Sequence, residues 1–228
     1  MEVSVEALVR RGWTIGEMLL LYGAGPAILS ILVYKGHIPL LIILPLVFAG
    51  LVTLLLRQSD QTWRADIVRL PAWRDVVSIL ALFALCGGAL TIFAYDRYPQ
   101  WFLAFPRSNA RLWLLVMVFY PVISVTTQEL IYRVLFFHRY APAMNGASAA
   151  TMAINAALFA AMHAILFASR GSFHWEAVCI SFLGGIIFAY RYTRTRSYFA
   201  VWLEHALYGD LIFTIGLGRF FFTGVFHL

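Results

Sequence analysis

Charged residues are scarce in this chain: they make up 12% of its 228 residues, whereas hydrophobic residues make up 62%. A soluble domain carries about 25% charged residues, which keep its surface in water. The shortage therefore excludes an ordinary soluble protein and indicates that lipid is the solvent of most of the chain. We expect no soluble domain beside the membrane part.

Cysteine and lysine are also rare. The two cysteines, Cys86 and Cys179, stand alone inside apolar runs, so a disulfide framework and a cysteine metal pair are both excluded. The formal charge of +6 comes almost entirely from arginines, which lie mostly between the apolar runs rather than in one block. Basic connectors of this kind set the orientation of a chain in the membrane and contact anionic lipid headgroups. We therefore expect the lipid bilayer as a partner, and no nucleic acid.

Long apolar runs are what the chain has in abundance. Backbone inside lipid must satisfy its own hydrogen bonds, so these runs are expected to be helices. We predict an all-α fold: a polytopic transmembrane bundle of about seven helices that forms a single integral membrane domain over residues 1–228. The predicted helices cover residues 17–34, 38–56, 75–95, 112–137, 147–169, 175–190 and 198–217.

The two ends of the chain carry expectations of their own. No charged segment, short apolar core and small-residue cleavage site precede the first span, so it is expected to remain as an anchor. The aromatic tail 220–228 is too short to span a bilayer alone. It is expected to be an interfacial segment or part of a bent last helix, which would make an eighth helix.

The connector at residues 57–74 predicts the orientation of the chain. It is the longest hydrophilic connector and contains four arginines and two aspartates. Arginine-rich connectors stay on the cytoplasmic side of a membrane. We therefore expect this connector and the N-terminus to be cytoplasmic.

Glu129 and Arg133 stand out because a charged side chain at the bilayer centre costs about 2.5–3.5 kcal/mol and so needs a partner or a use. Four residues apart, they stack on one helix face as an ion pair. In the purely structural alternative, Glu129 only neutralises an arginine at the cytoplasmic end of its helix. We favour a functional pair because intramembrane carboxylates commonly mark sites.

Two further polar groups lie on later helices. His163 is surrounded by alanines, which let a neighbouring helix approach closely, and a lone histidine here could simply bond across helices. Glu204, His205 and Asp210 follow in the last predicted helix, with bare backbone at Gly209 on the same face as His205. Helix packing at Gly209 is the structural alternative. The depths of Glu129, His163 and His205 allow the three side chains to converge.

These segments, in this order, resemble the CPBP family of CAAX prenyl proteases and bacteriocin-processing (Abi-like) intramembrane proteases. The family pattern is two adjacent glutamates, three residues and Arg, then Phe-x-x-x-His, then His-x-x-x-Asn or Asp. The chain has Gln128-Glu129-x-x-x-Arg133, Phe159-x-x-x-His163, and His205 followed by Gly209-Asp210. The resemblance covers about residues 120–217 and implies N-terminal spans in 1–110 and a catalytic core in 111–218.

Two positions depart from the family pattern. Gln128 replaces the first glutamate, the one usually taken to activate water, and an amide is no general base. Gly209 replaces the Asn or Asp four residues after His205, and the nearest carboxylate is displaced to Asp210. After the first departure, either Glu129 is the base or the chemistry is altered or lost. The second departure puts an oxyanion-stabilising side chain at that position in doubt.

The resemblance implies an intramembrane endopeptidase of the glutamic type that needs no cofactor. Peptide hydrolysis requires a water, a base, donors for the oxyanion and an acid for the leaving amine. We expect Glu129 to be the base, His163 to share the water and return a proton, and His205 to bind the oxyanion. Arg133 would orient Glu129, and Gln128 would position substrate or water; Asp210 is included as a candidate catalytic residue.

Two rival interpretations stay open. Two histidines and a glutamate are also ligands of catalytic zinc, although the chain has no His-Glu-x-x-His motif. The same buried polar groups could serve a non-catalytic transport or binding protein. The lack of repeated halves argues against a transporter, whereas Gln128 keeps the binding protein in play.

The expected substrate is a membrane-associated protein or peptide that is cut near the membrane surface. Prenylated CAAX tails are the eukaryotic precedent of the family, and trimming of C-terminal anchor segments in bacteria is equally compatible. The expected location is the bacterial inner (cell) membrane.

Overall fold

The computed structural model describes residues 5–58, 60–168 and 173–221, and across these residues every regular element is a helix. Most of the predicted tail 220–228 and the end of the predicted helix 147–169 lie outside the described residues. The helices are α1 (Val5–Leu19), η1 (Leu20–Ala24), α2 (Gly25–Tyr34), α3 (Leu40–Leu56), α4 (Trp63–Val68), α5 (Trp73–Arg97), α6 (Ala104–Ser108), α7 (Ala110–Phe119), η2 (Tyr120–Val125), α8 (Thr126–Glu129), η3 (Leu130–Tyr140), η4 (Ala141–Met144), α9 (Ala149–Ala168), α10 (Trp175–Thr195), α11 (Tyr198–Thr214) and η5 (Leu217–Phe220).

The predicted all-α membrane bundle is confirmed, and each of the seven predicted segments corresponds to helix. Among the described residues, four helical stretches are long and apolar enough to cross a membrane: Gly12–Tyr34, Trp73–Arg97, Ala110–Met144 and Ala149–Leu166. Large apolar side chains cover the outside of the bundle, as at Leu46 and Leu85, which are 69% and 72% exposed. Such a surface is stable in lipid and not in water, so this is an integral membrane protein.

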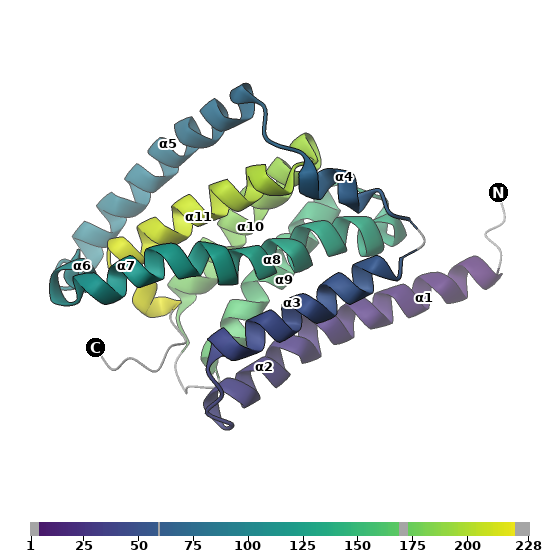
Figure 1. Ribbon diagram of the computed structural model, residues 1–228, viewed down its shortest axis with the longest axis horizontal. Coiled ribbons are helices and arrows are strands. Elements are labelled where there is room, and N and C mark those ends of the chain that lie inside the picture. The colour runs from purple at the N-terminus through teal and green to yellow at the C-terminus, as the bar shows by residue number, and fades with distance from the viewer. Residues whose placement is uncertain (1–4, 59, 169–172, 222–228) are drawn as a thin grey trace.

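One long helical span, Ala110–Met144, runs through the middle of the molecule (Figure 1). It has wide π-helical turns at Tyr120–Val125 and Leu130–Tyr140, on either side of the short α-helical segment that carries Gln128 and Glu129. Pro121 lies in the first wide turn, where its missing N–H breaks the regular bonding pattern. Wide turns of this kind occur often at functional sites.

Helix α11 lies against this central span, with α5 on its other side (Figure 1). The indole N–H of Trp202 holds α11 in place because it is shared between two acceptors of the central span. Nε1 lies 3.0 Å from the Pro121 carbonyl oxygen and 3.1 Å from Thr126 Oγ1. The hydroxyl of Tyr198 donates to the carbonyl of Thr126 at 3.2 Å. The bonds of Trp202 fix which face of α11 points toward Glu129.

Helices α9 and α10 approach each other closely because small residues meet between them. A Cβ atom added at Gly185 would come within 2.9 Å of the Cα atom of Ala156. The alanines around His163 therefore do allow close packing of a neighbouring helix, as the sequence predicts. This contact places Phe159 of α9 beside Phe188 of α10, with ring centroids 6.3 Å apart.

A buried carboxylate, Asp66, attaches the short helix α4 to one end of the bundle. Its side chain accepts a bond from the Tyr192 hydroxyl at 2.7 Å and contacts His138 Nε2 at 2.9 Å and the Arg196 guanidinium at 3.0 Å. Burial alone would raise the pKa of Asp66, but the bonds from His138 and Tyr192 and the charge of Arg196 outweigh it and hold the pKa below its ordinary value. The arginine-rich connector is thus part of the folded structure.

Candidate active site

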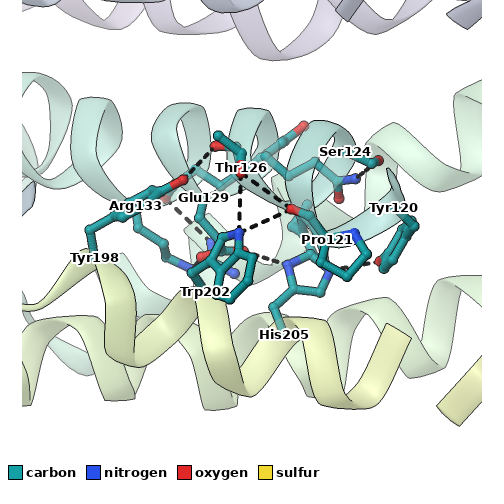
Figure 2. Close-up of polar contacts among 12 residues, drawn as sticks. Tyr120, Pro121, Ser124, Thr126, Glu129, Arg133, Tyr198, Trp202 and His205 are labelled. Atoms are coloured by element: carbon teal, nitrogen blue, oxygen red, sulfur yellow. Dashed lines mark hydrogen bonds and ion pairs between the residues drawn. The ribbon is translucent and has the colours of Figure 1, made fainter. Parts of the chain in front are cut away.

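The candidate residues come from three helical segments that meet near the middle of the molecule. Gln128, Glu129 and Arg133 lie on the central span, His163 lies on α9, and His205 lies on α11. Figure 2 shows Glu129, Arg133 and His205 pointing toward one another across the space between the central span and α11.

Glu129 is fully buried, and its two oxygens face two different basic side chains. Its Oε1 lies 2.7 Å from Nδ1 of His205, and its Oε2 lies 3.3 Å from Nε of Arg133. The expected pair of Glu129 with Arg133 one helical turn away is therefore formed. The contact with His205, which joins residues 76 positions apart, is what builds a site around it.

Arg133 is also fully buried, and its position is fixed from several sides. Its NH1 donates to Asn155 Oδ1 at 2.6 Å and to the carbonyl of Tyr132 at 3.3 Å. Its guanidinium lies over the rings of Phe159 and Phe188, at 5.3 and 5.7 Å from the ring centroids. An arginine held this firmly keeps a negative charge on Glu129 stable in an apolar interior.

The bonds of His205 define its tautomer. A carboxylate only accepts hydrogen bonds, so Nδ1 carries the proton that bonds Glu129, and Nε2 of the neutral ring is an acceptor. Nε2 lies 3.2 Å from the hydroxyl of Tyr120, which then donates to it. The ring stacks on Phe188 with centroids 4.6 Å apart. The basic nitrogen of His205 is thus held in a fixed orientation.

His163 lies one phenyl ring away from His205. Its Nδ1 donates to the carbonyl of Phe159 at 2.9 Å, which leaves Nε2 as an acceptor. The Phe159 ring contacts both imidazoles, with centroids 4.9 Å from His163 and 5.6 Å from His205. The structure therefore brings Glu129 and His205 into contact, and brings His163 beside them without a direct hydrogen bond to either.

A cavity of about 1100 Å³ opens in front of the two histidines. Its wall is mostly apolar and comes from α2, α3, α5, the central span, α9, α10 and α11, with Gln128, His163 and His205 among the few polar side chains. Glu129 is not among the lining residues; it lies behind His205. A large apolar cavity with a few convergent polar groups is the usual form of a site for an apolar or amphipathic ligand.

Gln128 faces this cavity on the central span. Its Nε2 bonds the hydroxyl of Ser124 at 2.7 Å, while its Oε1 is buried without a hydrogen-bond partner. A buried acceptor costs free energy unless it finds a donor. The position that carries the first glutamate in the family pattern therefore lies at the cavity wall.

The two other acidic residues of α11 lie apart from this contact. Glu204 accepts two bonds from Arg191 of α10, at 2.9 and 3.0 Å. Asp210 is not among the residues that line the cavity, and its Oδ1 is buried without a partner. Neither carboxylate is placed beside the nitrogens of His163 or His205 that accept protons.

Two neighbours of the site carry no sequence signal of their own. Asn155 accepts a hydrogen bond from Arg133, and Tyr120 bonds His205, in both cases across helices. No sequence motif points to Asn155 or to Tyr120. The bare backbone of Gly209 was the one hint, because it predicted that something would pack closely there. Within the described residues, no group of three or more His, Cys, Asp and Glu side chains is arranged to hold a metal ion.

One of three comparisons with known proteins found a match. Residues 110–209 match the family model of the Rce1-like type II CAAX prenyl endopeptidases, which confirms the resemblance drawn from the motifs. The matched stretch contains Gln128, Glu129, Arg133, His163 and His205 and ends just before Asp210. The comparison with curated proteins and the comparison with solved structures each found no match.

Proposed function

We propose that this protein is an intramembrane endopeptidase of the glutamic type that cleaves membrane-associated polypeptides near the membrane surface. The observation that carries the proposal is the contact between Glu129 and His205, 2.7 Å apart, at the wall of a large apolar cavity. The match to the CAAX endopeptidase family model supports a peptidase. The geometry supports a particular division of work among the residues.

Glu129 acts through His205 in this proposal. The carboxylate lies behind the imidazole and is 0% exposed, so it has no direct contact with a water molecule in the cavity. It holds the proton on Nδ1 and stabilises the imidazolium that forms when Nε2 takes a proton from water. This replaces the expectation that Glu129 itself contacts the water and that His205 binds the oxyanion.

Arg133, His163 and Gln128 support the reaction in different ways. Arg133 places its guanidinium beside the carboxylate of Glu129, at 3.3 Å, and so orients it. His163 presents Nε2 to the same cavity and can hold the attacking water against its target. Gln128 lines the same cavity, where its side chain can position the substrate. Asp210 receives no part in the chemistry, because it does not line the cavity.

The cavity also supports the proposed class of substrate. Its apolar walls suit an apolar segment or an attached lipid, and its few polar groups can bond the polar atoms of a peptide. We place the protein in the bacterial inner (cell) membrane with its N-terminus in the cytoplasm. The arginine-rich end of the bundle around Asp66 supports that orientation.

The test is cleavage of a membrane-tethered reporter peptide by purified protein in liposomes, followed by mass spectrometry of the products. We expect the reporter to be cut at one peptide bond inside its chain, so that the mass spectra show two defined fragments. A reporter that is bound saturably but recovered intact would instead favour the binding protein, in which Gln128 has replaced the water-activating glutamate. Uptake of the intact reporter into the liposome lumen would favour a transporter.

A further inference from the structure

Tyr120 and Gly209 occupy the same space in this protein. A Cβ atom added at Gly209 would lie 2.2 Å from Cε1 and 2.6 Å from the hydroxyl oxygen of Tyr120, and real Cβ contacts are essentially never shorter than 3.0 Å. A side chain at 209 and the ring of Tyr120 therefore exclude each other. The family pattern has Asn or Asp at position 209, so the tyrosine ring here fills the place of that side chain.

The hydroxyl of Tyr120 is held beside the proton-accepting atom of the site. It lies 3.2 Å from Nε2 of His205, and the ring packs edge-on against Phe213 with centroids 5.1 Å apart. Tyr120 also lines the cavity, as do His205 and Gly209. It begins the wide turn Tyr120–Val125, in which Pro121 follows it directly, and this local geometry turns the ring toward α11 (Figure 2).

We propose that the Tyr120 hydroxyl is the oxyanion donor of this enzyme and takes over the role left vacant at Gly209. The inference rests on the proposed function, since it concerns the same reaction. Tyrosine hydroxyls can serve as oxyanion donors in enzymes, so the chemistry has precedent in kind. A glycine at 209 then follows from the tyrosine at 120, because only glycine leaves room for the ring.

The hydrogen bonds of the site support a sequence of proton movements. In the resting site, Tyr120 donates to Nε2 of His205. When the water oxygen bonds the carbonyl carbon, one water proton moves to Nε2, and the carbonyl π electrons move to its oxygen. Nε2 has one lone pair, so the water displaces the Tyr120 hydroxyl as its proton moves to Nε2, and the hydroxyl then donates to the new oxyanion. The imidazolium protonates the leaving nitrogen as the C–N bond breaks and the C=O bond forms again, which yields a carboxylic acid and an amine.

The first experiment removes the hydroxyl and keeps the ring. Tyr120→Phe is expected to lower kcat about 10²–10³-fold with KM little changed, as when one oxyanion donor is removed from an enzyme. The matched control is Tyr198→Phe, which deletes a hydroxyl bond of the same length, 3.2 Å, between the same two helical segments but outside the cavity. That control is expected to keep its kcat. Tyr120→Phe with wild-type kcat would overturn the inference.

The second experiment exchanges the two side chains. Gly209→Asn alone is expected to be inactive, because the new side chain collides with Tyr120. Tyr120→Ala with Gly209→Asn is expected to be at least about tenfold faster than Tyr120→Ala alone, because a donor returns to the same space. No rescue in a folded double variant would contradict the inference. A wild type that cleaves nothing would overturn the proposed function as well, whereas an active wild type with an equally active Tyr120→Phe variant overturns the inference alone.

Discussion

Two glutamates, Glu129 and Glu204, lie on neighbouring helices, and both are 0% exposed and paired with an arginine. Arg191 satisfies both oxygens of Glu204 and also bonds Ser78 of α5 at 2.6 Å. Glu129 gives one oxygen to His205, and its other oxygen faces Arg133 without a hydrogen bond. Both oxygens of Glu204 therefore accept hydrogen bonds from an arginine, whereas Glu129 accepts its hydrogen bond from a histidine.

The comparison teaches that burial and charge do not by themselves identify a site in a membrane protein. Both glutamates need a cation to be stable in an apolar interior, so their arginines are explained by stability alone. The difference is that Glu129 bonds His205, which lines the cavity. Glu204 on α11 bonds Arg191 of α10, which in turn bonds Ser78 of α5, so this cluster holds three helices together. We therefore assign function to the first cluster and helix assembly to the second.

The largest effect is expected from Glu129→Gln. The amide cannot hold the Nδ1 proton of His205 as a carboxylate does, so cleavage of the reporter peptide should fall about 10³–10⁴-fold, as for the carboxylate partners of other catalytic histidines. Rates are to be measured per folded molecule in liposomes. Undiminished cleavage in a folded variant would erase the distinction between the two glutamates and show that His205 acts without Glu129.

Glu204→Gln is the matched change in the other cluster. It leaves Arg191 without its carboxylate, which should cost about 3–5 kcal/mol of stability, as does breaking a buried ion pair. Thermal unfolding in detergent measures that loss, and the Glu129→Gln variant should lose a comparable amount because Arg133 is also left unpaired. The rate per folded Glu204→Gln molecule should equal that of the wild type. A large loss of kcat without unfolding would place Glu204 in the chemistry.

Asp66→Asn extends the comparison to the carboxylate at the end of the bundle. Because bonds from His138 and Tyr192 and the charge of Arg196 depress its pKa in the folded protein, Asp66 stabilises the fold above its unfolded pKa of about 4. That contribution is lost as the pH falls through the folded pKa. The variant should therefore be about 2 kcal/mol less stable than the wild type at pH 7, and the difference should shrink below about pH 4. A difference that does not change with pH would refute this role.

The seven apolar stretches predicted the bundle well, and the errors have physical causes. The prediction for the sixth helix stops at residue 190, before Arg191, whereas α10 continues to Thr195 because Arg191 finds Glu204 beside it. The short helix α4 was missed because its six residues show no lipid-facing pattern; Trp63 and Asp66 hold it by burial within the bundle. Contacts with residues distant in sequence therefore determine both where α10 ends and why α4 forms.

The site was predictable where its partners are close in sequence and not where they are distant. The pair Glu129 and Arg133 follows from a spacing of four residues on a helix. The contact of Glu129 with His205 depends on how α11 is rotated against the central span, which its bonds through Trp202 determine. Tyr120 and Asn155 also belong to the site through contacts between different helices, so no local sequence pattern could predict them.

A smaller effect is expected from Gln128→Glu. This change restores the pair of glutamates in the family pattern and places a carboxylate at the cavity wall, where the amide oxygen now has no partner. We expect cleavage to be preserved or raised up to about tenfold, within the range of one added general base. Abolished cleavage in a folded variant would mean that the amide of Gln128 is itself needed, for example to bind the substrate.

No effect is expected from removing metal. Glu129 already has Arg133 and His205 as cationic and hydrogen-bonding partners, so its charge is balanced without zinc. Elemental analysis of active protein should find no stoichiometric zinc, and chelation should leave the rate unchanged. About one zinc per chain, with activity lost to a chelator and restored by zinc, would make His205 a ligand and Glu129 its orienting partner.

The most direct test of the account is a double-mutant cycle on Glu129 and His205. If Glu129 acts only through His205, the variant with both Glu129→Gln and His205→Gln should cleave the reporter no more slowly than His205→Gln alone, because groups that act as a unit are not additive. The rate per folded molecule of the wild type, the two single variants and the double variant gives the answer. Losses that multiply in the double variant would show that Glu129 contributes independently of His205 and would contradict the proposed site.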